Sequence, residues 1–206
     1  MIRVTEYESL GKGKLRIRLD NRAELVLYRG EARRVGLEPE VEIAEETYQL
    51  LIDEIVGKRA KKRALYLLEQ MDRTEHQLRE KLAKGGYPQE CIDAAIAYVK
   101  RFHYLDDYRY ACNFIRYSQG KYSRQQMKIR LAQKGIAREL VANAIEETYT
   151  ADESEQIQSL LLKRKFSAEC DDKEFKRTYQ YLMRRGFGSS EVLHMMKNYG
   201  CEAPES

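Results

Sequence analysis

The sequence predicts a mainly α protein, with three tandem copies of a three-helix repeat in an elongated, curved array behind a small β-hairpin or sheet. Three observations predict this fold. Apolar residues recur every second position in the first 40 or so residues, as in strands, and every three to four positions after Pro39, as in helices. From residue 60 onward, one glycine-containing segment occurs three times at nearly constant spacing. A single unit cannot bury its apolar side alone, so we expect the copies to stack.

The N-terminal head has the pattern of two or three half-buried strands. Apolar and charged residues alternate over residues 14–20, and a second strand candidate spans residues 24–28. Asp20 and Asn21 supply turn-forming side chains between them. Apolar residues at positions 2 and 4 suggest a third strand. These features predict a small antiparallel sheet or hairpin.

An amphipathic helix is predicted after the head. Between Glu45 and Gly57, apolar side chains recur at helical spacing. Two glutamates stand at its start, where negative charge complements the positive end of a helix dipole. We expect this helix to end at Gly57 and to connect the head to the repeats.

The repeat is defined by three glycines in matching contexts, Gly86, Gly135 and Gly186. They stand 49 and 51 residues apart, and each follows a leucine by four positions. Apolar residues recur six and ten positions after each glycine, so a helix follows each one in the same register. A glycine between two helices supplies the positive φ that ends the first of them, so we interpret all three as structural.

Capping residues mark where the second helix of each repeat begins. Thr74 and Ser123 stand 12 residues before the first two glycines, and each is followed three positions later by glutamine, which is the pattern of a capping box. In the third copy, the candidates Asp171 and Asp172 stand 15 and 14 residues before the glycine, which predicts a longer second helix. The predicted boundaries are a head at residues 1–58 and repeats at residues 59–105, 106–150 and 151–206.

Composition argues against several classes of protein. No cysteine pair has the C-x-x-C spacing of a zinc or redox site, and the 3 histidines are isolated, so we expect no metal or other cofactor. No glycine-rich phosphate loop or nucleophile elbow is present, so no small-molecule substrate is expected.

The longest apolar run, residues 94–99, is far shorter than the ~20 residues of a membrane span, and no signal peptide is recognisable. We expect a cytoplasmic protein without a membrane association. Its cysteines are expected to be reduced and mostly packing residues: Cys91, Cys112, Cys170 and Cys201.

The adjacent carboxylates of Asp106 and Asp107 are the feature most similar to a catalytic pair. Such a pair would need a further acid–base or metal partner nearby. An aspartate directly before the apolar-periodic stretch 108–118 instead fits a helix N-cap, which satisfies open backbone N–H groups. We therefore interpret both residues as structural and expect no catalytic activity.

Charge is distributed unevenly along the chain. The net charge is +4, yet the stretch from Tyr108 to Arg138 contains no Asp or Glu. A solvated helix surface usually carries both signs, so this stretch favours an interaction surface for a polyanion or an acidic protein. Its eight basic residues are the candidate contacts: Arg109, Arg116, Lys121, Arg124, Lys128, Arg130, Lys134 and Arg138.

The expected helix over the second part of this stretch places these cations on two sides. Met127 and Leu131 mark its buried seam, with Arg124 and Lys128 on one flank, and Arg130 and Lys134 on the other. Tyrosines are interleaved with the cations, and they either stack on nucleic-acid bases or pack in the core. These are Tyr108, Tyr110, Tyr117 and Tyr122.

Four sets of short segments, in this order, carry a resemblance to a known family: Arg73-Thr74 with Gln77-Leu78 and Lys81-Leu82; Tyr104-Leu105-Asp106-Asp107 with Tyr110-Ala111; Lys134-Gly135-Ile136; and Arg184-Arg185-Gly186-Phe187. Through them, roughly residues 60 to 200 resemble the RecX family, regulatory proteins of the RecA recombinase. The resemblance implies tandem three-helix repeats. It also implies a non-enzymatic regulator that lodges in the groove of the RecA–DNA filament and restrains its ATPase, strand-exchange and co-protease activities. The family has no catalytic residues to transfer.

Two other functions stay open from the sequence. The chain could bind single- or double-stranded DNA directly and affect recombination by coating it, because its basic stretch suits either partner. An enzyme such as a nuclease would require clustered acidic or histidine ligands, which the sequence does not present. Comparing the affinity for RecA filaments with the affinity for the same DNA uncoated separates the first two functions.

Overall fold

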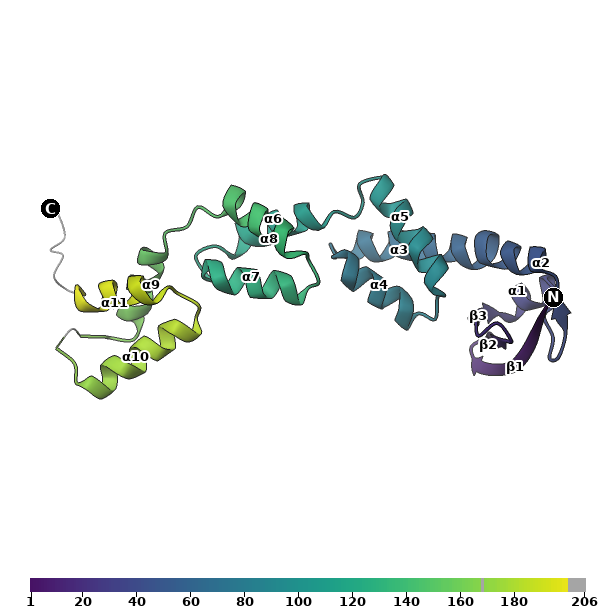
Figure 1. The fold of residues 1–206 in the computed structure, drawn as a ribbon, viewed down its shortest axis with the longest axis horizontal. Helices are drawn as coiled ribbons and strands as arrows, with labels where there is room; N and C mark the ends of the chain where they lie inside the picture. Colours follow the sequence, from purple (N-terminus) through teal and green to yellow (C-terminus); the bar gives the residue numbers. More distant parts are fainter. Residues whose placement is uncertain (168, 200–206) are drawn as a thin grey trace. The chain divides into compact units, whose positions relative to one another are not determined.

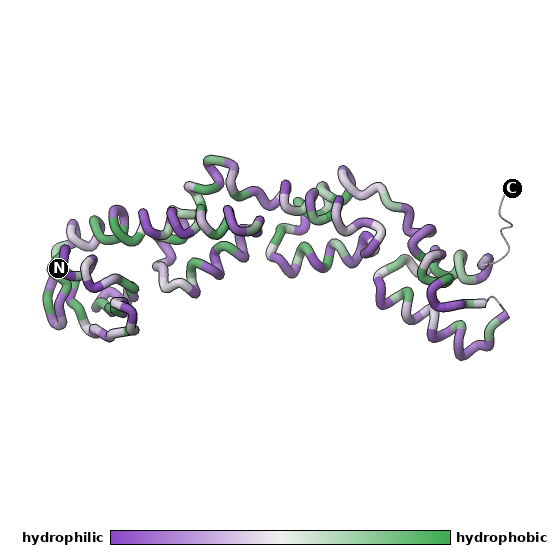
Figure 2. The backbone as a smooth tube through the Cα atoms, turned by 180° about the vertical axis from the view of Figure 1, so that it is seen from behind, coloured by the Kyte–Doolittle hydropathy of each residue, from purple (hydrophilic) through white to green (hydrophobic). Residues whose placement is uncertain are grey.

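A computed structural model describes residues 1–167 and 169–199 and divides the chain into two compact units, with the boundary in the sequence between Asp107 and Tyr108. It confirms the predicted fold class, since a small N-terminal sheet precedes three-helix repeats (Figure 1). Hydrophobic and hydrophilic residues alternate along the helices, as expected for helices with one buried side (Figure 2). Among the described residues, no helix combines the length and apolar character needed to cross a membrane.

The head of the first unit contains a four-stranded antiparallel sheet in the order β3-β2-β1-β4. Its strands are β1 (Ile2–Gly11), β2 (Lys14–Leu19), β3 (Glu24–Tyr28) and β4 (Glu42–Ile43). The predicted alternation is confirmed in β2, where Leu15, Ile17 and Leu19 are buried. The two-residue β4 and the six-residue helix α1 (Arg29–Arg34) were not expected, because neither is long enough to show a period.

The helix after the head does not end at Gly57, contrary to the prediction. The chain runs from α2 (Glu45–Leu50) through the π-helix η1 (Leu51–Gly57) directly into α3 (Lys58–Gln70). Gly57 is buried with φ −64°, a right-handed helical value. A Cβ built on Gly57 would lie 2.5 Å from the carbonyl oxygen of Ile52. The glycine therefore lets the wider π-turn form, a role that periodicity does not reveal.

The head packs against the first repeat through one continuous hydrophobic core. Arg59 of α3 is central to this contact. Its guanidinium lies 5.2 Å from the ring centroid of Tyr28 and 5.5 Å from that of Tyr87. It also pairs with Glu31 and donates a hydrogen bond to the backbone carbonyl of Val26. One half-buried cation thus joins the sheet, α1 and the first repeat.

Each repeat contains three helices, as predicted. The first repeat uses α3, α4 (Glu75–Lys84) and α5 (Gln89–Arg101). The second uses α6 (Asp107–Ser118), α7 (Arg124–Gln133) and α8 (Arg138–Thr148). The third uses α9 (Glu153–Lys163), α10 (Asp172–Arg184) and α11 (Ser189–Lys197). The expected longer second helix is confirmed in the third copy, since α10 has 13 residues and both α4 and α7 have 10.

The three repeat glycines adopt the left-handed conformation that the sequence predicts. Their φ angles are +78° at Gly86, +83° at Gly135 and +79° at Gly186. Two of them also allow close packing. A Cβ on Gly86 would lie 2.5 Å from Val26 Cγ2 in the sheet, and one on Gly186 would lie 2.9 Å from Ser123 Oγ. Glycine is required at these positions by neighbouring elements as well as by φ.

The predicted helix caps are present, with one difference. At Thr74 the capping box is complete, because its hydroxyl accepts from the Gln77 amide and the Gln77 side chain accepts from the Thr74 amide. At Ser123 only half of the predicted capping box is found among the described residues, because the hydroxyl accepts from the Gln126 amide but the Gln126 side chain does not accept from the Ser123 amide. The Ser123 hydroxyl also donates to the backbone carbonyl of Arg185, 2.7 Å away. This serine therefore caps α7 and connects the second repeat to the third.

The role predicted for Asp107 needs correction. Asp107 is the first residue of α6, while Asp106 immediately precedes that helix. The Asp107 carboxylate accepts a hydrogen bond from the backbone amide of Glu75, 2.8 Å away, at the start of α4. It therefore caps a helix that begins 32 residues earlier. Burial raises the pKa of Asp107 above its ordinary value, against the opposing effect of this backbone hydrogen bond.

Replacing Asp107 by alanine is expected to lower the free energy of unfolding by about 1–2 kcal/mol, because it leaves a helix N-terminal amide without its acceptor. Asparagine keeps an acceptor oxygen and carries no charge to bury, so Asp107→Asn should retain most of the stability. Urea denaturation followed by circular dichroism measures both changes. Equal stability of the alanine variant and the parent chain would contradict this capping role.

Candidate functional site

The middle-repeat basic surface consists of the eight cations predicted from the sequence: Arg109 and Arg116 on α6, Lys121 before α7, Arg124, Lys128 and Arg130 on α7, Lys134 at its end, and Arg138 at the start of α8. The structure leaves all of them exposed except Lys134, which is half-buried. The secondary structure of the repeat thus presents most of these charges to solvent.

Most of these charges form no ion pair with the described residues. In the described part of the chain, no carboxylate lies within 4.0 Å of six of the eight cationic groups: Arg116, Lys121, Arg124, Lys128, Arg130 and Arg138. The sheet of the head differs, because Arg16 and Arg18 each pair there with two glutamates. The middle-repeat basic surface can therefore offer its charge to an external partner.

Tyrosines hold several of these cations in place. The guanidinium of Arg130 lies 4.0 Å from the ring centroid of Tyr122, and the ammonium of Lys121 lies 5.5 Å from the same centroid. Lys134 lies 5.7 Å from the ring centroid of Tyr110. Both tyrosines pack against the core of the repeat, so their rings support cations from within. Among the four interleaved tyrosines, Tyr117 is the one whose ring is largely free to stack on a base, since it is 89% exposed.

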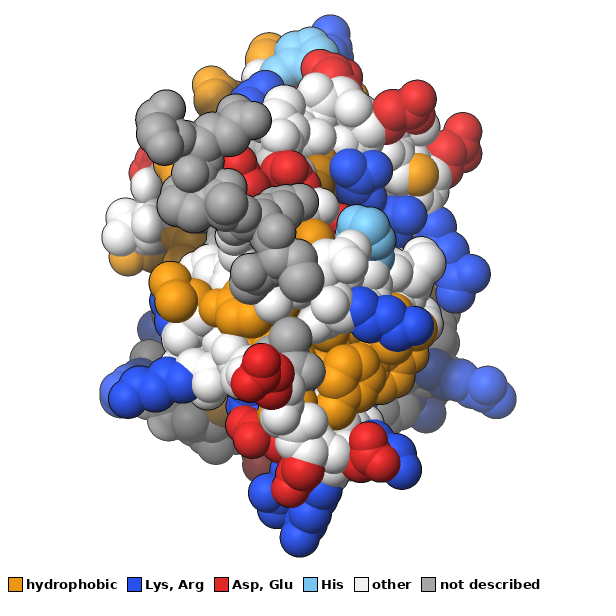
Figure 3. All heavy atoms as spheres, turned by 90° about the vertical axis from the view of Figure 1, so that its left-hand side faces the viewer, with side chains coloured by type: hydrophobic (Ala, Val, Ile, Leu, Met, Phe, Trp, Pro, Cys, Tyr) orange, Lys and Arg blue, Asp and Glu red, His pale blue; other side chains and the backbone are white. Residues whose placement is uncertain are grey.

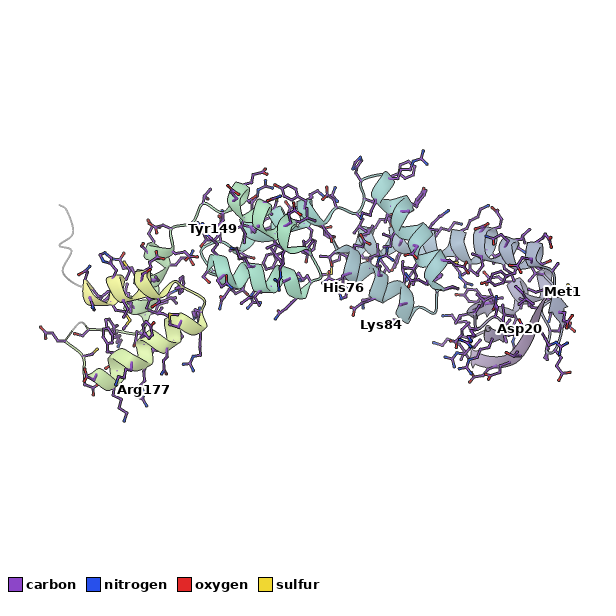
Figure 4. The ribbon with its side chains drawn as sticks, in the orientation of Figure 1. Met1, Asp20, His76, Lys84, Tyr149 and Arg177 are labelled. Atoms are coloured by element: carbon purple, nitrogen blue, oxygen red, sulfur yellow. The ribbon has the colours of Figure 1, made fainter. Side chains whose placement is uncertain are left out.

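Arg124 has a different environment from the other cations on α7. Its guanidinium lies 4.8 Å from the ring centroid of Tyr149, at the end of α8 (Figure 4). Its backbone amide donates a hydrogen bond of 2.6 Å to the carboxylate of Glu153 on α9. An acidic group from outside the carboxylate-free stretch thus reaches the start of α7, which the sequence did not indicate.

A groove between α7 and α8 brings together two cations that are ten residues apart, Lys128 and Arg138. The groove has a volume of about 390 Å³ and is mostly apolar. The predicted grouping of Lys128 with Arg124 on one flank is therefore incomplete, because Arg138 joins that flank. Arg130 and Lys134 turn toward the tyrosines of the opposite side, as their positions on the helix predicted.

A second group of cations and aromatic rings, in the first unit, was missed from the sequence. The ring centroids of Tyr98 and Phe102 are 5.0 Å apart, and those of Phe102 and Tyr104 are 6.4 Å apart. Lys61 and Arg101 lie over two of these rings. The four-residue spacing of Tyr98 and Phe102 in the sequence predicts that their side chains are neighbours on one helix. The contact of Lys61, which comes from α3, could not be predicted from the sequence.

The described residues offer little for metal or thiol chemistry. Among them, no group of three or more His, Cys, Asp or Glu side chains is arranged to hold a metal ion. Cys91 and Cys112 are buried, as expected for packing residues, and Cys170 is half-buried. Burial raises the pKa of the Cys91 thiol to about 12, so it stays protonated at neutral pH. Cys201 lies outside the described residues.

The charge on the end view in Figure 3 is mixed. Basic and acidic side chains are interspersed there, and apolar side chains are exposed between them. Such mixing is typical of an ordinary solvated surface. The contrast with the carboxylate-free stretch supports the middle-repeat basic surface as the candidate interface.

Comparisons with known proteins agree with this architecture. Two family models match, described as "RecX, first three-helix domain" over residues 60–98 and "RecX, second three-helix domain" over residues 106–145. A "Regulatory protein RecX" of Caldanaerobacter subterraneus subsp. tengcongensis is 32% identical over 155 residues, which cover 74% of this chain and 77% of that protein. A protein of the same name from Clostridium botulinum (strain Eklund 17B / Type B) is 23% identical over 203 residues, 96% of each chain.

Solved structures show a similar fold. A crystal structure titled "Crystal structure of regulatory protein RecX" covers 96% of this chain, with a TM-score of 0.66 and 22% identity. A crystal structure of RecX from Lactobacillus salivarius covers 71% of this chain, with a TM-score of 0.63 and 20% identity. At these identities, the similarity extends to the fold alone.

Proposed function

Since this chain belongs to the RecX family of regulatory proteins, we propose that it is a non-enzymatic regulator that binds the RecA–DNA filament and mainly inhibits its ATPase, strand-exchange and co-protease activities. The observation that carries this proposal is the middle-repeat basic surface. A filament of nucleic acid and protein is a large polyanionic target, and an exposed surface rich in cations is attracted to it over long range.

The proposed contact with the filament uses exposed cations, two of which lie against a tyrosine ring. Arg130 and Lys121 are supported by the ring of Tyr122, which reduces the conformational freedom they would lose on binding. Arg138 and Lys128 project from two helices around one groove. Binding through such groups releases condensed counterions, so we expect inhibition to weaken as salt concentration rises.

Direct binding to DNA is the alternative function, and Tyr117 favours it. This tyrosine stands next to Arg116 on α6 and exposes most of its ring, as a base-stacking side chain would. In this alternative, the chain coats DNA and affects recombination without contacting RecA. Both functions predict salt dependence, so salt alone does not separate them.

The affinity for preformed RecA filaments, compared with the affinity for the same DNA without RecA, separates the two functions. We expect binding to filaments assembled on a fluorescent single-stranded oligonucleotide with a non-hydrolysable ATP analogue to be at least tenfold tighter than binding to the free oligonucleotide. Fluorescence anisotropy at fixed ionic strength measures both. Inhibition of the RecA ATPase should then saturate at a molar ratio of this protein to RecA that is set by the number of binding sites on the filament. Equal affinity for both forms, with inhibition abolished by excess free DNA, would support the coating alternative instead.

A further inference from the structure

The groove between α7 and α8 is a hollow of the second repeat that packing leaves unfilled. It is lined by Gln125, Lys128, Ile129 and Ala132 of α7 and by Arg138, Val141 and Ala142 of α8. Its volume of about 390 Å³ lies within the range of sites that hold organic groups and exceeds what one ordered water needs.

The floor of the groove is apolar and accessible. Ile129 is 48% exposed, and Ala132 and Ala142 beside it are also exposed. Met127 and Leu131, by contrast, are fully buried and already form the seam of α7 with the rest of the repeat. Packing of the repeat therefore does not explain the isoleucine, whose exposure keeps apolar surface in water.

The rim of the groove carries one sign of charge. Lys128 lies on the α7 side and Arg138 on the α8 side, and no carboxylate lines the groove. Neither cation has an ion-pair partner within the described part of the chain. An occupant that suits both parts of the site has an apolar group for the floor and negative charge for the rim.

We propose that this groove binds an acidic polypeptide segment of the filament protein, with one apolar side chain seated on Ile129 and neighbouring carboxylates paired with Lys128 and Arg138. The assignment rests on the proposed function and makes it more specific, because it assigns part of the contact to protein. A nucleic-acid backbone supplies the charge but carries no aliphatic group for the floor, whereas an apolar side chain flanked by Asp or Glu supplies both.

Filling the groove without changing its charge tests the assignment. Ala132→Leu and Ala142→Leu each add an aliphatic side chain at an exposed helical position where leucine is well tolerated. Ala83→Leu is the matched control, because Ala83 occupies the equivalent position in the first repeat and is also exposed. Fluorescence anisotropy measures the affinity of each full-length variant for RecA filaments and for the same oligonucleotide alone. Circular dichroism checks that the fold is retained.

We expect each groove variant to bind filaments about tenfold more weakly than the parent chain, with an unchanged affinity for free DNA. The control should match the parent in both assays. Two variants on different helices keep the test valid if one of them folds poorly. Parent-like filament binding by both groove variants would overturn the groove assignment while leaving the proposed function intact. Equal losses for filaments and free DNA would also overturn it, in favour of a nucleic-acid occupant. Failure of the parent chain itself to bind filaments would refute the proposed function together with this assignment.

Discussion

Replacing Gly86 by alanine is expected to lower the free energy of unfolding of the first unit by about 2–5 kcal/mol. Two costs add. The residue has φ +78°, and the left-handed region costs an ordinary L residue about 1–2 kcal/mol. The new Cβ would also lie 2.5 Å from Val26 Cγ2, and forcing an extra carbon into a packed contact costs a further ~1–3 kcal/mol. Urea denaturation monitored by circular dichroism measures the loss.

Gly36→Ala is the matched control for the backbone cost. Gly36 has φ +68° in the same unit, and a Cβ on it would meet no atom within 4 Å, so its loss should be limited to about 1–2 kcal/mol. Val26→Ala tests the contact. In the Gly86→Ala background it removes the overlapping methyl groups, so the double variant should be more stable than the sum of the single losses predicts. If the losses of stability in Gly86→Ala and Val26→Ala are strictly additive, or if Gly36→Ala and Gly86→Ala lose the same stability, the proposed contact between the sheet and the Gly86 turn is wrong.

Reversing two cations of the middle-repeat basic surface is expected to weaken RecA filament binding by about tenfold or more at moderate salt. Arg124 and Lys128 stand one turn apart on α7, and both are exposed without an ion pair in the described structure. Arg124→Glu with Lys128→Glu changes the charge by four units where the surface faces the proposed polyanionic partner. A glutamate at position 124 suits the positive N-terminal end of α7 but also stands near the Glu153 carboxylate, so circular dichroism is used to check that the fold is retained.

The same double reversal on the third repeat provides the control. Lys173 and Arg177 are exposed cations one turn apart on α10, and acidic residues surround Lys173 in sequence (Figure 4). Their reversal should change filament affinity by less than threefold, because that surface already carries both signs. The neutral pair Arg124→Gln with Lys128→Gln should give an intermediate loss. Equal effects of the two reversals would indicate that the filament contacts another part of the chain.

Local sequence patterns were sufficient for much of the fold. Strands β2 and β3 follow from alternation, and the helices of the repeats follow from apolar spacing. The left-handed glycines and the cap at Thr74 follow from rules that involve a few neighbouring residues. The carboxylate-free stretch could also be recognised from the sequence, because counting the charges along two helices does not require knowing which elements pack against them.

Contacts between distant segments were not predictable in the same way. Asp107 was expected to cap its own helix, yet it accepts from an amide 32 residues earlier. Gly57 was expected to end a helix, yet it allows a π-turn. Neither residue type nor spacing distinguishes these outcomes, since aspartate serves any nearby helix start and glycine suits both uses.

The order of residues alone therefore establishes a head of strands, three helical repeats and a one-signed stretch, because helix and strand periods and charge are properties of neighbouring residues. The packed structure is needed for everything that depends on which segments meet. It unites Lys128 and Arg138 around an apolar groove, seats Arg130 on Tyr122, and brings Val26 against Gly86. These contacts arise from close packing of side chains that are distant in the sequence, and such packing produces no periodic pattern of residues.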